Sequence, residues 1–304
     1  MSLTITLAVC LAAALDRTVR EPPSAIHPVA LFGSLVGRFD REWPMARFVG
    51  IGVALVLPVA AGLAVGGVVF LASLAHPVAG GVVAGLALFT TTSLRMLLDE
   101  AAGVIEASAT DPAAARERLP ALAGRDPTDL SPELLRSAAV ESASENLADG
   151  LVAPLLAFSL LAPVSLAAGV AGAAWIKAVN TLDSMLGYPS KPHGWASARL
   201  DDLAMWVPAR LSALLLSVAA RSPDPLLTAR RWRTATSSPN SGWPMATAAG
   251  ALQVRLEKPD TYVLNELASL PTVEQARRGV RLVGTAGLLA YALAALLGVV
   301  PWLL

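Results

Sequence analysis

Residues 51–74 read Ile51-Gly-Val-Ala-Leu-Val-Leu-Pro-Val-Ala-Ala-Gly-Leu-Ala-Val-Gly-Gly-Val-Val-Phe-Leu-Ala-Ser-Leu74 and contain no acidic or basic side chain. A helix needs about 20 apolar residues to cross the roughly 30 Å hydrocarbon core of a bilayer. Segment 78–98 follows after His76-Pro77 and is nearly as apolar, and 280–304 closes the chain with a third such run. The sequence therefore predicts an all-α, polytopic membrane protein.

The composition of the whole chain agrees with this prediction. Of its 304 residues, 55% are hydrophobic and only 15% are charged, whereas soluble domains usually carry about 25% charged residues. The 23 basic and 23 acidic side chains cancel, so no excess of positive charge predicts nucleic acid as a partner. We expect one integral membrane domain, 1–304, with the lipid bilayer as its partner and a short first helix over 2–15.

Two segments in the middle of the chain are less regular. Segment 151–174 contains Pro154 and Pro163, and 203–220 contains Pro208. If both cross fully, the polar residues between them face the opposite side from 141–150; if both are re-entrant or broken, all the polar stretches share one side. We favour the re-entrant alternative, in which half-length helices that meet at a proline enter the membrane and return, because it brings the polar stretches together. Arginines in 16–50 and in the amphipathic helical segment 99–150 place that side in the cytoplasm of a multi-pass cell-membrane protein.

The stretch Glu141-Ser-Ala-Ser-Glu-Asn-Leu-Ala-Asp-Gly150 runs directly into apolar sequence. Carboxylates spaced by four residues lie on one helix face and repel one another. This row of carboxylates is consistent with a bound cation, or with a solvated amphipathic helix at the membrane surface.

Two further stretches carry charged groups at helical spacing. Lys177-Ala-Val-Asn-Thr-Leu-Asp-Ser184 places its polar groups on one face, as either an internally satisfied Lys–Asp pair or a binding site. Arg199-Leu-Asp-Asp202 fits a salt-bridge network, or Mg²⁺ held by one or two carboxylates plus phosphates. We expect one helix face to carry Asp202, Trp206 and Arg210.

The remaining polar stretches are less specific. His27 precedes Pro28, as a loop residue or as a catalytic group. Ser237-Ser-Pro-Asn-Ser-Gly-Trp-Pro244 leads into an expected helix over 245–256, whose N-terminus either binds an anion or binds nothing. The sequence contains no phosphate-binding loop, dinucleotide fingerprint or zinc-type cluster.

Taken together, these stretches resemble the adenosylcobinamide-phosphate synthase (CobD/CbiB) family of cobalamin biosynthesis, in family order over nearly the whole chain. One departure is Leu256-Glu-Lys-Pro259, which stands where the family usually has a glycine pair. The matching stretches are His27-Pro-Val, Gly124-Arg-Asp, Glu141-Ser-x-x-Glu-Asn-x-x-Asp-Gly150, Lys177-Ala-Val-Asn-Thr-Leu-Asp-Ser-Met-Leu-Gly187, Ala196-Ser-Ala-Arg-Leu-Asp-Asp202, Pro208-Ala-Arg210, Ser238-Pro-Asn-Ser-Gly242 and Ala249-Gly-Ala-Leu.

The resemblance implies an amide-forming ligase. It would join a propionate carboxylate of adenosylcobyric acid to (R)-1-aminopropan-2-ol or its phosphate, with ATP and Mg²⁺. A second copy of the chain or other corrinoid-pathway enzymes would be further partners. The expected catalytic residues are Glu141, Glu145, Asp149, Lys177 and Asp183. The expected metal ligands are Glu145, Asp149, Asp183, Asp201 and Asp202. The expected substrate-binding residues are His27, Asn146, Asn180, Ser184, Arg199, Arg210, Ser238 and Asn240.

Two alternatives stay open, a transporter and a non-catalytic scaffold for corrinoid intermediates. Transporters usually place ionisable residues at mid-span, whereas 51–74 and 78–94 contain none. A scaffold would leave the crowded carboxylates unexplained. The sequence therefore favours the enzyme.

Overall fold

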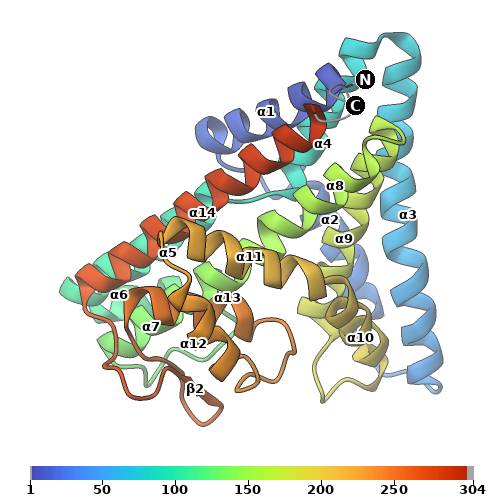
Figure 1. Cartoon of the computed structure of the whole chain (residues 1–304). Helices are drawn as coiled ribbons and strands as arrows, with labels where there is room; N and C mark the ends of the chain where they lie inside the picture. Colours follow the sequence, from blue (N-terminus) through green and yellow to red (C-terminus); the bar gives the residue numbers. More distant parts are fainter. Residues whose placement is uncertain (1, 300–304) are drawn as a thin grey trace. The chain divides into compact units, whose positions relative to one another are not determined.

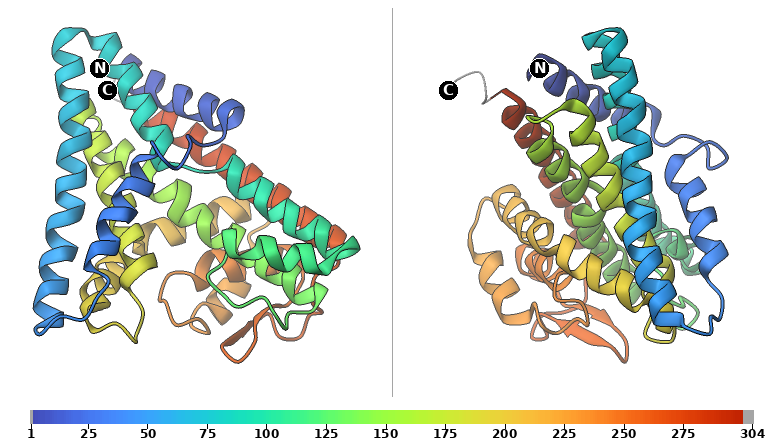
Figure 2. Two further views of the ribbon diagram at one scale, coloured as in Figure 1. Left: turned by 180° about the vertical axis from the view of Figure 1, so that it is seen from behind. Right: turned by 90° about the vertical axis from the view of Figure 1, so that its right-hand side faces the viewer.

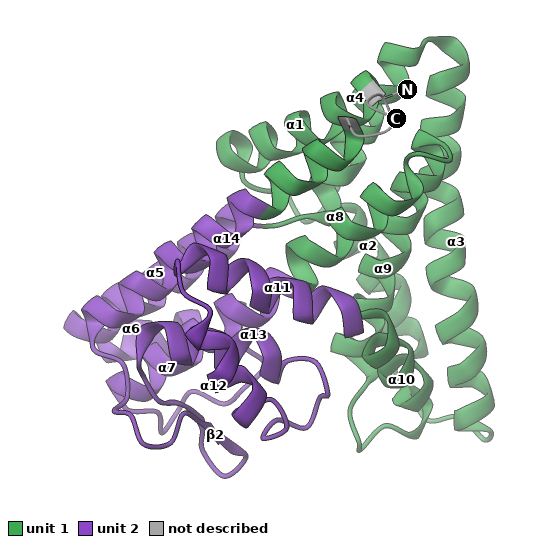
Figure 3. Cartoon of the chain, in the orientation of Figure 1, with its two compact units in different colours: residues 1–93, 149–205, 290–304 green, residues 94–148, 206–289 purple. Residues whose placement is uncertain are grey.

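The structure is a computed structural model that describes residues 2–299, so the end of the predicted span 280–304 lies outside the described residues. The described chain is mainly helical, with one short β-hairpin, and the all-α prediction is confirmed. The chain divides into two compact units (Figure 3). Unit 1 comprises 1–93, 149–205 and 290–304, and unit 2 comprises 94–148 and 206–289.

Three helical stretches are long and apolar enough to cross a membrane: Ala46–Ala75, Pro77–Thr110 and Val273–Gly298. A fourth is counted if α10 (Trp195–Ala204) and α11 (Trp206–Ala219) form one broken span. The first stretch is α3, which begins five residues before the predicted Ile51. The predicted span 78–98 is interrupted, since α4 (Pro77–Thr91) ends before α5 (Arg95–Thr110) begins. The third stretch belongs to α14 (Val273–Val299).

Close helix packing organises unit 1. Helix α3 packs along α9 (Leu166–Leu186), and α1 (Ser2–Val19), four residues longer than predicted, packs along α4 (Figures 1 and 2). Glycines permit the α3–α9 approach, since a Cβ added to Gly62 would lie 2.8 Å from the Ala171 carbonyl oxygen. One added to Gly66 would lie 2.9 Å from the Ala167 carbonyl oxygen. Small residues therefore bring the two backbones together, as in other membrane helix pairs.

Segment 151–174 is divided into two helices, whereas 203–220 is mostly one continuous helix, α11, with a break only near its start. Segment 151–174 contains all of α8 (Ala153–Leu161), and Ser165 then caps α9 by accepting a hydrogen bond from the Ala168 amide. Helix α10 ends at Ala204, and one residue, Met205, separates it from α11. Asp202 is therefore not on the same helix as Trp206 and Arg210, and the prediction of a shared face was wrong.

A π-helical turn, η3 (Ala148–Val152), joins α7 (Pro132–Leu147) to α8. In an α-helix, the N–H of each residue bonds the carbonyl four residues earlier. Pro154 has no N–H, so it cannot bond the Gly150 carbonyl in this way. That carbonyl instead accepts the Ser93 amide at 2.9 Å. Such turns are frequent at functional sites, and this one carries Asp149.

The other elements of unit 1 are short. They are α2 (Pro28–Val36), the 3₁₀ turns η1 (Gly37–Phe39) and η4 (Pro192–Gly194), and α10. Helix α2 packs on α9, and α10 packs on both α9 and α3. These contacts place the polar residues of α9 beside α10.

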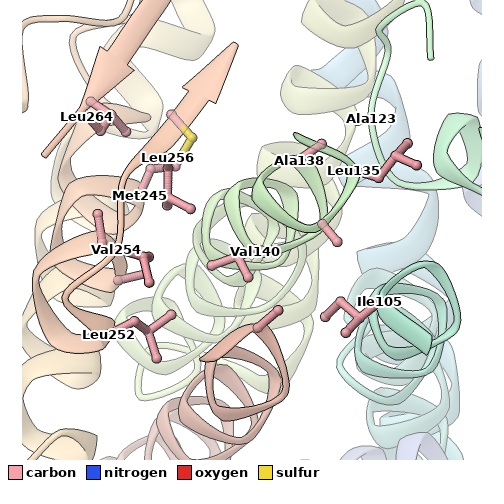
Figure 4. Close-up of a cluster of buried hydrophobic side chains, with 14 of the residues drawn as sticks. Ile105, Ala123, Leu135, Ala138, Val140, Met245, Leu252, Val254, Leu256 and Leu264 are labelled. Carbon is pink, nitrogen blue, oxygen red and sulfur yellow. The ribbon is translucent and has the colours of Figure 1, made fainter. Parts of the chain in front are cut away.

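Unit 2 has its own apolar core (Figure 4). Leu135 and Val140 of α7 belong to it together with Met245 and Leu252 of α13 (Gly242–Leu252). The amphipathic region 99–150 consists of α5, α6 (Pro112–Arg118), the 3₁₀ turn η2 (Leu119–Ala121) and α7, and α12 (Asp224–Trp232) packs on α13.

The predicted end of the helix over 245–256 was wrong. Helix α13 stops at Leu252 because Gln253 takes a left-handed conformation with φ of 55°. Strand β1 (Leu256–Lys258) then pairs antiparallel with β2 (Tyr262–Leu264), with Leu256 opposite Leu264. Three-residue strands are too short to show a clear alternation in sequence.

Candidate functional site

Unit 1 brings together predicted residues from three elements. Helix α9 carries Lys177, Asn180 and Asp183, η3 carries Asp149, and α10 carries Asp201. The Asn180 side chain hydrogen-bonds to both Asp149 and Asp201. Asp149 also interacts electrostatically with Lys177 and Asp183. These five side chains are called the unit 1 acidic cluster below.

The acidic cluster contains three carboxyl groups but only one basic group, Lys177. Burial raises the pKa of Asp149 to about 6, although the charge of Lys177 acts in the opposite direction. Burial, followed by repulsion from Asp202, raises the pKa of Asp183 to about 6 as well. Burial lowers the pKa of Lys177. A further cation would therefore stabilise the ionised carboxylates.

The donor set fits Mg²⁺ only with help from other ligands. The buried Oδ1 atom of Asp201 has no hydrogen-bond partner within residues 2–299. In the same range, no group of three or more His, Cys, Asp or Glu side chains is gathered closely enough to hold a metal ion. Mg²⁺ commonly takes one or two carboxylates and completes its shell with water and substrate phosphates. The acidic cluster can provide that number.

His27 lies beside this cluster and caps a helix. Its Nδ1 accepts the Val29 amide at 3.2 Å, at the start of α2. Its Nε2 lies 3.7 Å from Glu21 Oε2, and burial lowers the pKa of the imidazole. Lys177 interacts electrostatically with both His27 and Glu21. This neutral imidazole is therefore part of the surroundings of Lys177.

The other predicted residues of unit 1 are more exposed. The Ser184 hydroxyl donates to the Asn180 carbonyl of its own helix. Arg199 is 68% exposed, and its Nη1 lies 3.4 Å from Asp202 Oδ2. Ser184 and Arg199 each contact a residue of their own helix. The structure therefore gives these two side chains no role beyond the surface of their helices.

Glu141 is the centre of a second group, in unit 2. Only 1% of its side chain is exposed, and Oε2 accepts from Arg125 Nη2 at 2.9 Å and from the Tyr262 hydroxyl at 2.7 Å. Oε1 accepts from the Ser137 hydroxyl at 2.7 Å. Burial, followed by the charge of Glu141, raises the pKa of Tyr262. A carboxylate held by three donors is suited to positioning Arg125 and Tyr262 rather than to removing a proton.

Sequence reasoning gave no role to Arg125 or Tyr262. Arg125 lies in the matched stretch Gly124-Arg-Asp, and that match was the available signal. Tyr262 follows a turn near the end of the chain, and no local pattern connects it with Glu141, which lies 121 positions earlier.

A polar cavity of about 210 Å³ lies next to this group within unit 2. Predicted residues Glu145 and Ser238 both line it, which places them at one site. Asn146 donates to the Ser142 carbonyl of its own helix. The full lining comprises Leu122, Ala123, Gly124, Arg125, Ser142, Glu145, Thr236, Ser237, Ser238, Ser241, Met245, Lys258 and Tyr262.

Arg210 and Asn240, also in unit 2, contact each other. Arg210 Nη1 donates to Asn240 Oδ1 at 2.7 Å and to the Trp206 carbonyl at 2.8 Å. Its guanidinium lies 4.4 Å from the centre of the Trp206 ring and 5.3 Å from that of Trp243. The aromatic rings and the amide fix this guanidinium, as expected for a binding group.

Comparison with known proteins adds evidence from outside the chain. A sequence model of the CobD/Cbib protein family matches residues 9–287. A "Probable cobalamin biosynthesis protein CobD" of Methanothrix thermoacetophila is 39% identical, covering 94% of this chain and 95% of its own. A "Cobalamin biosynthesis protein CobD" of Klebsiella pneumoniae is 38% identical, covering 98% of each chain. One of Geobacter metallireducens is 41% identical over 85% of this chain and 83% of its own. No solved structure matches.

Proposed function

Since the chain belongs to the CobD/Cbib family of cobalamin biosynthesis, we propose that it is the ligase that completes one corrinoid side chain. It joins a propionate carboxylate of adenosylcobyric acid to (R)-1-aminopropan-2-ol or its phosphate, at the cytoplasmic face of the cell membrane. ATP is the activating substrate. The observation that carries the proposal is the acidic cluster around Lys177 and Asn180, in a chain of this family.

The chemistry needs an activated carboxylate, because a carboxylate oxygen is a poor leaving group. In the first step a substrate carboxylate oxygen attacks the γ-phosphorus of ATP and ADP leaves, which gives an acyl phosphate. In the second step the amine nitrogen attacks the carbonyl carbon, the carbon–oxygen bond to phosphate breaks, and the nitrogen loses a proton to a carboxylate base. Positioning and charge neutralisation supply most of the catalysis in phosphoryl transfer.

The residues of unit 1 fit the first step. Lys177 is buried and interacts electrostatically with Asp149 and Glu21, and its charge can hold a phosphoryl oxygen. When bound, Mg²⁺ held by Asp149, Asp183 or Asp201 would neutralise phosphate charge. Asn180, bonded to two of these acids, keeps their orientation. Asp183 is the proposed base for the amine proton.

The test is direct synthesis by the purified protein. Detergent-solubilised protein is incubated with adenosylcobyric acid, Mg·ATP and either amine, and the amide and ADP are measured by chromatography and mass spectrometry. We expect one amide and one ADP per turnover, and loss of both in Asp183→Asn.

A transporter would give a different result. Purified protein would form no amide with either amine, but vesicles containing it would take up labelled corrinoid. That outcome would refute the ligase proposal. Absence of both activities, with normal insertion, would instead favour the scaffold alternative.

A further inference from the structure

The outer face of α11, in unit 2, carries a row of exposed apolar side chains. Val207, Leu214 and Val218 are 51%, 49% and 54% exposed. Their spacing of seven and four residues places them on one side of the helix, together with half-buried Leu211. The opposite side packs on α13. Contiguous exposed apolar residues with polar neighbours commonly mark a surface that contacts a membrane or another protein.

Helix α12 has an exposed face that is both apolar and basic. Leu227 is 63% exposed, and Arg230 and Arg231 follow it by three and four residues, so the three side chains project from the same side. Both arginines are exposed, and neither makes an ion pair within the described part of the chain. Pro225 and Ala229 are buried, and α12 packs on α13 as α11 does. The two helices therefore share one support.

The turn between α11 and α12 is fixed by its own hydrogen bonds. Arg221 takes a left-handed conformation with φ of 56°, and the Ser222 amide donates to the Ser217 carbonyl at 3.2 Å, as at a Schellman helix end. Ser222 Oγ then accepts the Asp224 amide at the start of α12. The Arg221 side chain is exposed, so it adds a third positive charge where the chain turns. The two exposed helix faces and Arg221 are called the α11–α12 surface below.

Length and charge decide which partner this surface fits. Helix α11 has 14 residues, or about 21 Å, which is too short to cross a hydrocarbon core of about 30 Å. Between positions 203 and 254 the chain has five arginines and one acidic residue, Asp224. Short helices with an apolar face and arginines beside it lie at the boundary between lipid headgroups and acyl chains. A second copy of the chain fits less well, because a symmetric contact would bring like charges together.

We propose that the α11–α12 surface lies along one leaflet of the bilayer and binds anionic phospholipids. The apolar row of α11 and Leu227 enter the acyl-chain region near the headgroups. The side chains of Arg221, Arg230 and Arg231 extend to the phosphate groups, which arginine binds well. The inference does not depend on the amide-forming reaction, and it gives unit 2 a membrane contact separate from the long apolar helices.

The first test places the surface relative to lipid and water. Cys10, the only cysteine of the chain, is removed by Cys10→Ser, and spin labels are attached to the single variants Leu214→Cys, Val218→Cys and Leu227→Cys. The full-length protein is reconstituted in vesicles of equal amounts of phosphatidylcholine and phosphatidylglycerol. We expect all three labels to collide more with oxygen, which concentrates in lipid, than with a water-soluble nickel complex. A label on Thr261→Cys, at an exposed position in the turn of the β-hairpin, gives the water-exposed reference.

The second test measures the preference for anionic headgroups. A fluorophore on Leu227→Cys is quenched by brominated phosphatidylglycerol or brominated phosphatidylcholine, each present as a minor component of phosphatidylcholine vesicles. Each arginine near an anionic lipid contributes roughly fivefold to binding. Arg230→Gln/Arg231→Gln should therefore reduce the preference for phosphatidylglycerol by about 5- to 25-fold, and high salt should reduce it in the wild type. The control Arg277→Gln/Arg278→Gln removes two neighbouring exposed arginines from α14 and should keep the preference.

Three results would overturn the inference. Labels on α11 and α12 that meet the nickel complex as readily as the label at position 261 would show a surface in water. Labels that meet neither reagent would show that protein covers the surface, such as a second copy of the chain. Equal quenching by the two lipids in the wild type, or a preference unchanged in Arg230→Gln/Arg231→Gln, would show that the arginines bind no headgroup. Thermal unfolding checks that each variant is folded, and Arg230→Gln alone decides the second test if the double variant does not fold.

Discussion

Replacing Glu141 by glutamine separates a structural carboxylate from a catalytic one. Glutamine keeps the size of the side chain and one carbonyl oxygen, but it removes the charge and exchanges an acceptor oxygen for an NH₂ donor. Arg125 and Tyr262 both donate to Oε2, while Ser137 donates to Oε1. If the NH₂ group is turned towards Arg125, one donor faces another donor. If it is turned towards Ser137, the hydroxyl can rotate to accept it, but the charge of Arg125 is still left without a counter-charge.

The size of the effect follows from burial. Glu141 is 1% exposed and Arg125 is 10% exposed, so neither charge is well solvated once its partner is lost. Removing one member of such a pair typically costs about 3–5 kcal/mol. Because whole domains are stable by only about 5–15 kcal/mol, Glu141→Gln should lower the unfolding temperature clearly. An exposed pair gives the comparison: Glu274→Gln removes the 2.9 Å contact with Arg281, and surface pairs contribute about 0–1 kcal/mol.

Unfolding in detergent by heat or by increasing SDS measures this difference, and amide formation is assayed in parallel. The double variant Arg125→Gln/Glu141→Gln removes both charges, so it should be at least about 1 kcal/mol more stable than the sum of the two single effects predicts. If Glu141→Gln unfolds like wild type but forms no amide, then Glu141 acts in the chemistry and the structural reasoning is refuted.

Four other predictions concern the acidic cluster and the helices around it. Asp183→Asn should insert and fold normally but form less than about 1% of the amide product, since one base or metal ligand is lost; wild-type rates would contradict this. Asp149 has a pKa raised from 3.8 to about 6, so the stability that it contributes below pH about 4 is lost as the pH rises through 6. Metal-free protein should thus lose up to about 3 kcal/mol over that range, and Asp149→Asn should flatten the profile of unfolding against pH. Gly66→Val should destabilise the α3–α9 contact by about 1–3 kcal/mol, because even a Cβ there lies 2.9 Å from a carbonyl oxygen; a Val variant as stable as wild type would disprove the close contact. Arg199→Ala should change the unfolding free energy by less than about 1 kcal/mol, and a large rise in KM without that loss would show that this exposed arginine binds substrate.

Hydropathy predicted the membrane helices well because a long apolar run has few alternatives to a spanning helix. The same reasoning failed at their ends. Thr92 begins the interruption between α4 and α5, and its hydroxyl bonds the Leu88 carbonyl. The break at Met205 is similar, since no glycine or proline stands there to mark it. Such ends depend on tertiary contacts, which a single sequence does not show.

The candidate site was predictable where its residues share an element. Lys177, Asn180 and Asp183 lie on one helix, so their spacing alone placed them on one face. The partners of Glu141 were not predictable in this way. Arg125 lies in a loop and Tyr262 in a hairpin, and folding rather than periodicity brings them to α7.

The three evenly spaced carboxylates that start at Glu141 have three different environments. Glu141 is neutralised by Arg125 and held by hydrogen bonds. Glu145, one turn later, lines the cavity of unit 2. Asp149 follows in the π-helical turn η3 and belongs to unit 1, where burial raises its pKa and Asn180 holds it. Chemical role is set by environment, so a repeated spacing does not imply a repeated role. The π-turn separates the last carboxylate from the first two, and it does so because Pro154 cannot continue the hydrogen bonding of the α-helix.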